Sequence, residues 1–274
     1  MFGTNPFASA AQGLPAGFMQ GFLCLMVLAV VAGVLFDIVH KGSARYFFEN
    51  WRTSRQRKGA RQLGGGELAS IAVQTALVDV MASGEFCNPR RRVAHLLTMY
   101  GFLTYVVTTA IMVFGDPAAP ATGLVPTLWW VGALMVLVGG LWFWFFIRAD
   151  VSAEGRSPFR LMRADLFIVS LLASVALGLV WALRGGGVGA FFWLYILATT
   201  VLFGSVTWSK FAHMFFKPAA AFDKRISRAN GTAENLPTQT RDDPEQQKRH
   251  SMELLQNAPM DMGLGIKREA PRHY

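Results

Sequence analysis

The chain has 274 residues, of which 53% are hydrophobic and only 16% carry a formal charge. This composition is too apolar for an ordinary soluble domain, so we predict an integral membrane protein. The net charge of +9 is unevenly distributed along the chain, and we attribute it to membrane orientation rather than to the binding of nucleic acid.

Residues 1–16 contain no Lys or Arg, which predicts an N-terminus on the outer, periplasmic side of the membrane. They lack the basic start of a cleavable signal peptide, and their apolar character continues into residues 17–39. A helix needs about 20 residues to cross the hydrocarbon core. We therefore predict that residues 17–39 form a first spanning helix that is retained.

The segment 40–92 is expected on the cytoplasmic side. Its first part, SARYFFENWRTSRQRKGARQ, mixes aromatic side chains with cations and suits a helix lying in the headgroup layer. After the glycines of LGGG, the stretch ELASIAVQTALVDVMASGEF has apolar residues roughly at helical spacing. Because this stretch is short and polar for a span, we predict a second amphipathic helix, either interfacial or docked on the bundle.

Four more segments have the length and apolarity of spanning helices, and they cover residues 93–114, 125–147, 164–183 and 189–216. No run shows the period-two alternation of a barrel strand. We therefore predict an all-α integral membrane protein with a five-transmembrane-helix bundle over residues 17–216. Residues 217–274 are polar and rich in Asn, Gln, Pro and charge, which predicts a cytoplasmic tail that is disordered in isolation.

The distribution of cations predicts the orientation. Lys and Arg gather in residues 41–92, in residues 148–163 and in the tail, whereas the connections on the other side carry only Arg184. Under the positive-inside rule the C-terminus is cytoplasmic. Cys24 and Cys87 lie too far apart in this topology to pair, and without a CxxC motif any iron–sulfur cluster would belong to a partner.

Three of the five histidines share the cytoplasmic side. His40 follows the first span, His95 lies near the start of the second, and His213 lies near the end of the fifth. Ionisable residues at membrane depth are functional-site candidates, although His40 also suits a hydrogen bond to a headgroup or a carbonyl. Two imidazoles at similar depth on facing helices can bind the iron of a b-type haem. Gly101 and Gly204 are expected to leave room for the macrocycle.

Further side chains are predicted to surround such a haem. They are Lys210, Trp208, Tyr100, Asp37 and His40. Lys210 or His40 is a candidate partner of a haem propionate or a quinone carbonyl, and Asp37 is a candidate proton carrier. The competing explanation for Lys210 is a side chain that snorkels to the interface.

The sequences RRRVAHLLTMYGFLTYVVTT and WSKFAHMFFKP, which contain His95 and His213, resemble the membrane cytochrome b family that includes the gamma subunit of respiratory nitrate reductase. They are more similar still to the membrane subunits of heterodisulfide-reductase-like quinone-interacting complexes. Within that group, a five-helix chain without a fused iron–sulfur domain resembles the membrane anchor associated with adenylylsulfate (APS) reductase in sulfur-oxidising bacteria. The resemblance covers residues 15–218 and implies that His95 and His213 are the axial ligands of a cytoplasmic-side haem b.

The two-haem members of this family carry a second, deeper histidine on each of the same two helices. Tyr105 and Tyr195 stand at those positions here. A phenol, with an ordinary pKa of about 10, is a poor haem ligand. We therefore predict one haem b near the cytoplasmic face, no outer haem, and two tyrosines packed inside the bundle.

Together, these expectations predict that the chain is a membrane anchor that transfers electrons. The resemblance implies that a cytoplasmic iron–sulfur and flavin oxidoreductase, adenylylsulfate reductase, docks on the basic inner face and exchanges electrons with the haem and the membrane quinone. The chain itself has no nucleophile triad, phosphate loop or carboxylate pair. Two alternatives are a haem-free structural anchor for the same kind of enzyme, and a small-molecule transporter, for which the spans offer few polar groups near the midplane.

Overall fold

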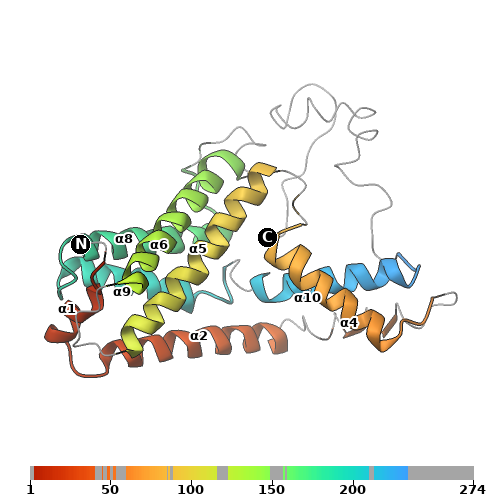
Figure 1. The fold of residues 1–274 in the computed structure, drawn as a ribbon, viewed down its shortest axis with the longest axis horizontal. Helices are drawn as coiled ribbons and strands as arrows, with labels where there is room; N and C mark the ends of the chain where they lie inside the picture. The colour runs from red at the N-terminus through yellow and green to blue at the C-terminus, as the bar shows by residue number, and fades with distance from the viewer. Residues whose placement is uncertain are drawn as a thin grey trace. The chain divides into compact units, whose positions relative to one another are not determined.

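The computed structural model describes part of the chain, and every element in that part is a helix (Figure 1). The predicted all-α fold is confirmed for these residues. They are residues 3–40, 45, 48–49, 52–53, 60–84, 86, 89–115, 123–148, 157, 159–209 and 213–233.

The chain divides into two compact units. Unit 1 consists of Met1–Leu35, Val93–Trp144 and Met162–Phe211. Unit 2 consists of Phe36–Arg92, Phe145–Leu161 and Ala212–Tyr274. Unit 1 contains most of the apolar helices, and unit 2 contains the segments that the charge pattern predicts on the cytoplasmic side.

Four helical segments are long and apolar enough to cross a membrane. They are α2 (Phe18–His40), α5 (Pro89–Phe114), α6 with the π-helix η2 (Leu124–Trp142 and Phe143–Ile147), and the 3-10 turn η3 with α8 (Arg163–Asp165 and Leu166–Leu183). Each coincides within a few residues with one of the first four predicted spans. The chain is therefore a multi-pass membrane protein, as predicted.

The fifth predicted span, residues 189–216, is not one helix. α9 (Ala190–Gly204) has 15 residues, and a turn over residues 205–208 follows it before α10 (His213–Ala229) begins. The prediction of a continuous helix was wrong because it followed apolarity alone, whereas Gly204 and Ser205 are weak helix formers. Residues 217–229 are helical, so the predicted start of the disordered tail was also wrong. Residues 234–274 lie outside the described part.

Unit 1 is organised around close helix contacts. α8 packs between α6 and α9. α5 and α6 touch through glycines, because a Cβ on Gly101 would lie only 2.8 Å from the carbonyl oxygen of Gly132. Small residues that let two backbones approach are the usual means of packing helices in lipid. α2 contacts α9 through the Phe18 and Trp193 rings, whose centroids are 6.0 Å apart.

A short helix that the sequence analysis did not predict, α1 (Pro6–Gly13), lies at one end of unit 1. The Asn5 side chain accepts a hydrogen bond from the Phe7 amide at 2.9 Å and caps the helix. The Asn5 Nδ2 atom also donates to the carbonyl oxygen of Met112, 3.3 Å away near the end of α5. The first bond starts the helix, and the second attaches the N-terminal segment to α5.

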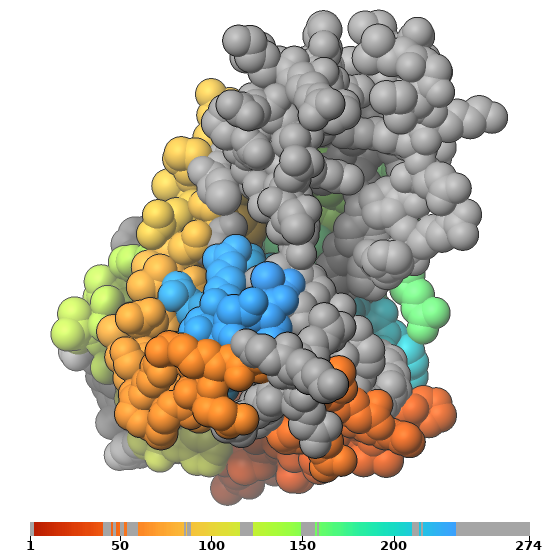
Figure 2. Space-filling model, turned by 90° about the vertical axis from the view of Figure 1, so that its right-hand side faces the viewer, coloured from red at the N-terminus to blue at the C-terminus, as the bar shows by residue number. Residues whose placement is uncertain are grey.

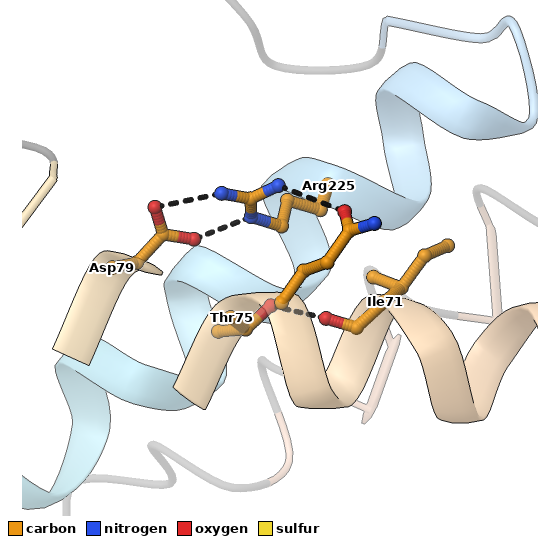
Figure 3. A network of polar contacts seen from close by, with 5 residues as sticks. Ile71, Thr75, Asp79 and Arg225 are labelled. Atoms are coloured by element: carbon orange, nitrogen blue, oxygen red, sulfur yellow. Dashed lines mark hydrogen bonds and ion pairs between the residues drawn. The ribbon is translucent and has the colours of Figure 1, made fainter. Parts of the chain in front are cut away.

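In unit 2, α4 (Gly65–Gln74) runs directly into the π-helix η1 (Thr75–Met81), and α10 packs against both (Figure 2). Arg225 of α10 binds Asp79 of η1 through two hydrogen bonds and Gln74 through a third (Figure 3). The second predicted amphipathic helix is therefore a helix, and its partner is α10. The first one falls mostly outside the described residues.

Candidate functional site

His95 lies on α5, six residues after the helix begins at Pro89, and its side chain is exposed. Its neighbour Ala94 is buried against α6, where a Cβ on Gly139 would lie 2.7 Å from the Ala94 carbonyl oxygen. Successive residues of an α-helix are about 100° apart around the axis. His95 is therefore turned away from the α5–α6 contact.

The face of α5 that carries His95 also carries Phe102, seven residues further along. The Phe102 ring lies 6.3 Å from the ring of Phe203 on α9. α9 ends one residue later at Gly204, where an added Cβ would meet no atom within 4 Å. His95 is about 10 Å further along α5 than the Phe102–Phe203 contact. It thus lies on the α9-facing side of α5, at a level beyond the end of α9.

Gly101 has a different role from the one predicted. A Cβ at this position would lie 2.7 Å from Cβ of Met135 and 2.8 Å from the backbone nitrogen of Val136, both on α6. The space that Gly101 leaves is therefore filled by α6 and gives no room to a macrocycle. That prediction was wrong because sequence spacing did not reveal which helix faces Gly101. Gly204, by contrast, has open space beside it.

His213 is the first residue of α10 and belongs to unit 2, whereas His95 belongs to unit 1. The side chain of His213 and the whole of Lys210 lie outside the described residues. The pairing of His95 with His213 as ligands therefore stays a prediction, as does the role of Lys210.

Asp37 and His40 lie on the last turn of α2. The Asp37 side chain is only 4% exposed. The His40 side chain is exposed, and its ring stacks on Phe36 with centroids 4.8 Å apart and planes at 19°. Burial of a carboxylate in an apolar helix keeps Asp37 a candidate for proton transfer.

Tyr100 and Trp208 are both exposed. Tyr100 is five residues after His95 on α5 and so lies on another face of the helix. Trp208 lies in the turn after α9, where its backbone amide donates to the carbonyl oxygen of Ser205 at 3.0 Å. Exposed aromatic side chains near the ends of apolar helices are typical of the membrane–water interface.

The two tyrosines at the second histidine positions are buried in unit 1, as predicted. The Tyr105 ring stacks on Trp129 with centroids 5.1 Å apart, and the Tyr195 ring stacks on Trp181 with centroids 5.5 Å apart and planes at 7°. Both tyrosines approach Gly178 of α8, where a Cβ would lie 2.8 Å from the Tyr105 hydroxyl oxygen and 3.2 Å from Cε2 of Tyr195. The space around Gly178 is therefore filled by closely packed aromatic rings.

The sequence analysis missed the part that α1 plays in this region. Phe7 of α1 packs edge-on against Trp129 and Trp181, with centroids 6.2 Å and 5.2 Å away. The pair Asn5–Pro6, a capping residue followed by proline, is a local signal for a helix start. A pocket of about 380 Å³ lies beside α1, near Trp130 and the end of α8. It is at the Met112 end of α5, roughly 25 Å along the helix from His95.

Comparisons of the chain with protein-family models, with curated proteins and with solved structures found no match. The cofactor, partner and site roles expected from the resemblance therefore stay predictions.

Proposed function

We propose that this chain is a membrane anchor and electron-transfer subunit that binds one haem b near the cytoplasmic face, with His95 and His213 as axial ligands. It would pass electrons between a cytoplasmic oxidoreductase and the membrane quinone. The observation that carries the proposal is the position of His95: an exposed imidazole on an apolar helix, on the side that faces α9 and beyond the point where α9 ends. An exposed histidine there suits ligation better than core packing.

Each candidate residue has a distinct part in this proposal. A haem bound there would supply a one-electron carrier close to the cytoplasmic face. His95 would supply one axial ligand from α5, and His213 would supply the other. His40 or Lys210 would bind a propionate or a quinone carbonyl. Asp37 would take up or release the proton that accompanies quinone redox chemistry.

The proposed orientation has the N-terminus outside and the C-terminus in the cytoplasm of a bacterium. The division into units supports it, because the three sequence segments of unit 2 nearly coincide with the three cation-rich segments. α9 would make the fifth crossing. Its 15 residues span only about 22 Å of helix, but it packs alongside α8, and the turn over residues 205–208 extends it.

The proposed partner is a cytoplasmic iron–sulfur and flavin oxidoreductase, with adenylylsulfate reductase as the specific candidate. A basic row on α10 supports a docking face for an acidic partner. Lys217, Lys224 and Arg228 repeat at spacings of seven and four residues, which places them on one side of the helix. None of the three is buried. The partner would carry the substrate chemistry, in the metabolism of sulfur compounds.

A single haem, rather than two, is part of the proposal. The region of Tyr105 and Tyr195 is lined by the stacked rings of Trp129 and Trp181, with Phe7 against both. A second macrocycle there would have to displace these rings. Densely packed interiors do not accept such insertions without repacking.

The test is a reduced-minus-oxidised absorption spectrum with pyridine haemochrome quantitation on the purified full chain, expressed with ample haem. We expect a b-type spectrum and about one haem per chain. His95→Ala and His213→Ala should each lose it, and His250→Ala in the tail should keep it. Folded protein without haem would overturn the cytochrome assignment.

A haem-free structural anchor is the second candidate, and the break between α9 and α10 favours it. Because the helix ends at Gly204, His213 is not carried on a continuous apolar helix. This candidate predicts that His95→Ala leaves co-purification of the soluble enzyme unchanged and that the wild-type protein shows no haem absorption.

A further inference from the structure

The helix formed by α4 and η1 has two different faces. One face packs on α10 and includes Ile71, Thr75 and Asp79, of which Ile71 and Thr75 are buried and Asp79 is bound by Arg225. The residues at Val73, Leu77 and Met81 are spaced four apart and share another face. Their side chains are 56%, 55% and 51% exposed. We call these three residues the apolar stripe.

The apolar stripe lies roughly opposite the face that α10 covers. Thr75, at the centre of the α10 contact, is two residues from both Val73 and Leu77, which corresponds to about 200° around the helix. α10 therefore cannot cover the stripe while it binds Asp79. The stripe extends about 12 Å along the helix. An isolated exposed apolar residue is ordinary on a protein surface. Three such residues in a row on one helix face indicate a surface that is covered in the functional protein.

One end of the stripe is joined to a spanning helix. The Nε atom of Arg92 donates a hydrogen bond to the carbonyl oxygen of Ala82 at 2.8 Å. Ala82 follows Met81 directly, and Arg92 lies on α5, one residue before the predicted entry into the hydrocarbon core at Val93. The Met81 end of the stripe therefore lies beside the start of α5, next to the residue at which the sequence predicts entry into the membrane.

The charges around this junction suit anionic headgroups. Arg90, Arg91 and Arg92 occupy the first turn of α5, and all three are exposed. Arginine side chains at the end of a spanning helix reach into the headgroup layer while their stems lie along apolar surface. The helix α4–η1 carries no Lys or Arg, and its two carboxylates, Glu67 and Asp79, are paired with Arg61 and Arg225. The apolar stripe itself therefore contains no charge that would keep it out of the acyl boundary.

We propose that the apolar stripe inserts into the bilayer surface, so that α4–η1 lies in the headgroup–acyl boundary with α10 stacked on its cytoplasmic side. Interfacial helices of this kind bury their apolar face about 5–10 Å into the boundary. The lipid surface is the occupant because the stripe begins where α5 enters the membrane. This arrangement does not depend on haem binding, so its test is independent of the test of the proposed function.

The experiment is site-directed spin labelling of the full chain in vesicles of phosphatidylcholine and phosphatidylglycerol, with Cys24 and Cys87 replaced by Ser. Single cysteines replace Leu77 and Val73 on the stripe, Ala220 on the exposed side of α10, and Ile71 in the α4–α10 contact. Power saturation then compares collisions with oxygen, which concentrates in lipid, and with a water-soluble nickel chelate.

We expect labels at Leu77 and Val73 to collide mainly with oxygen, the label at Ala220 mainly with the nickel chelate, and the label at Ile71 weakly with both. Stripe labels that behave like Ala220 would place the stripe in water. Stripe labels that behave like Ile71 would place it against protein, either a partner or a second copy. Either result would overturn the proposal.

Discussion

Gly178 is the residue on which the packing of the two buried tyrosines depends. It lies on α8 beneath both rings, and it lacks the side-chain atom that would collide with the Tyr105 hydroxyl oxygen. Tyr105 comes from α5 and Tyr195 from α9, so this one position lets three helices approach. The rings stacked on the tyrosines, Trp129 and Trp181, extend the contact to α6 and back to α8.

The substitution Gly178→Ala should destabilise the protein. The new Cβ would lie 2.8 Å from the Tyr105 oxygen, well inside van der Waals contact, and overpacking of a buried site costs about 1–3 kcal/mol. The measurement is the apparent melting temperature in detergent. Adding Tyr105→Phe should recover part of the loss, because it removes the colliding hydroxyl.

Gly204→Ala is the matched control for this prediction, because a Cβ at Gly204 on the last residue of α9 would meet no atom within 4 Å. It should melt at or slightly above the wild-type temperature, since alanine favours a helix over glycine. Equal melting of Gly178→Ala and the wild type would show that the tyrosines have room to move apart.

At the scale of elements, Arg225 of α10 joins this helix to both α4 and η1 through three hydrogen bonds. Arg225 pairs with Asp79, and the two side chains are 27% and 12% exposed. One bond joins Nη2 to Oδ1 at 2.9 Å, a second joins Nε to Oδ2, and Nη1 reaches Gln74 Oε1 at 3.3 Å. The planar guanidinium makes this geometry available.

Arg225→Lys should loosen α10 although the charge is kept, because an ammonium group cannot bind both carboxylate oxygens in the same geometry. Hydrogen exchange of the α10 amides should become roughly tenfold faster than in the wild type, since local opening costs less. Arg228→Lys, on the exposed side of the same helix, is the control and should exchange at the wild-type rate. Equal rates in the two variants would mean that apolar contacts, such as that of Ile226, hold the helix.

For the whole molecule, the number of membrane crossings determines the side of the membrane on which α10 lies. Four helical segments have the necessary length, and α9 is shorter. With the N-terminus outside, five crossings place α10 in the cytoplasm and four place it outside. The position of α10 therefore decides whether unit 2 lies on one side of the membrane, as the proposed docking face requires.

Labelling with a membrane-impermeant maleimide distinguishes the two topologies. In a background without Cys24 and Cys87, cysteines replace Gln12 on α1, Gln62 before α4 and Arg228 on α10, all exposed positions. We expect the cysteine that replaces Gln12 to react in intact spheroplasts. The cysteines that replace Gln62 and Arg228 should react only after lysis. If the cysteine at the position of Arg228 reacted in intact spheroplasts while the one at Gln62 did not, the chain would cross the membrane four times and not five.

The sequence by itself determined the helical class and the four long apolar helices, and it predicts the side of the membrane on which the cations gather. These are local properties: about 20 apolar residues in a row suffice for a span, and cations flanking a span suffice for its orientation. The same local information placed His40 at the end of α2, His95 near the start of α5, and Tyr105 and Tyr195 deeper in their helices.

Only the tertiary structure decided what surrounds those residues. Gly101 packs against α6 rather than lining an open space, His95 is exposed because α9 ends at Gly204, and α10 folds onto α4–η1 instead of continuing the span. Each of these depends on contacts between segments far apart in the chain. Apolarity and spacing show that a residue lies on a helix, but the packing of the other helices determines whether its side chain is buried, exposed or free to bind.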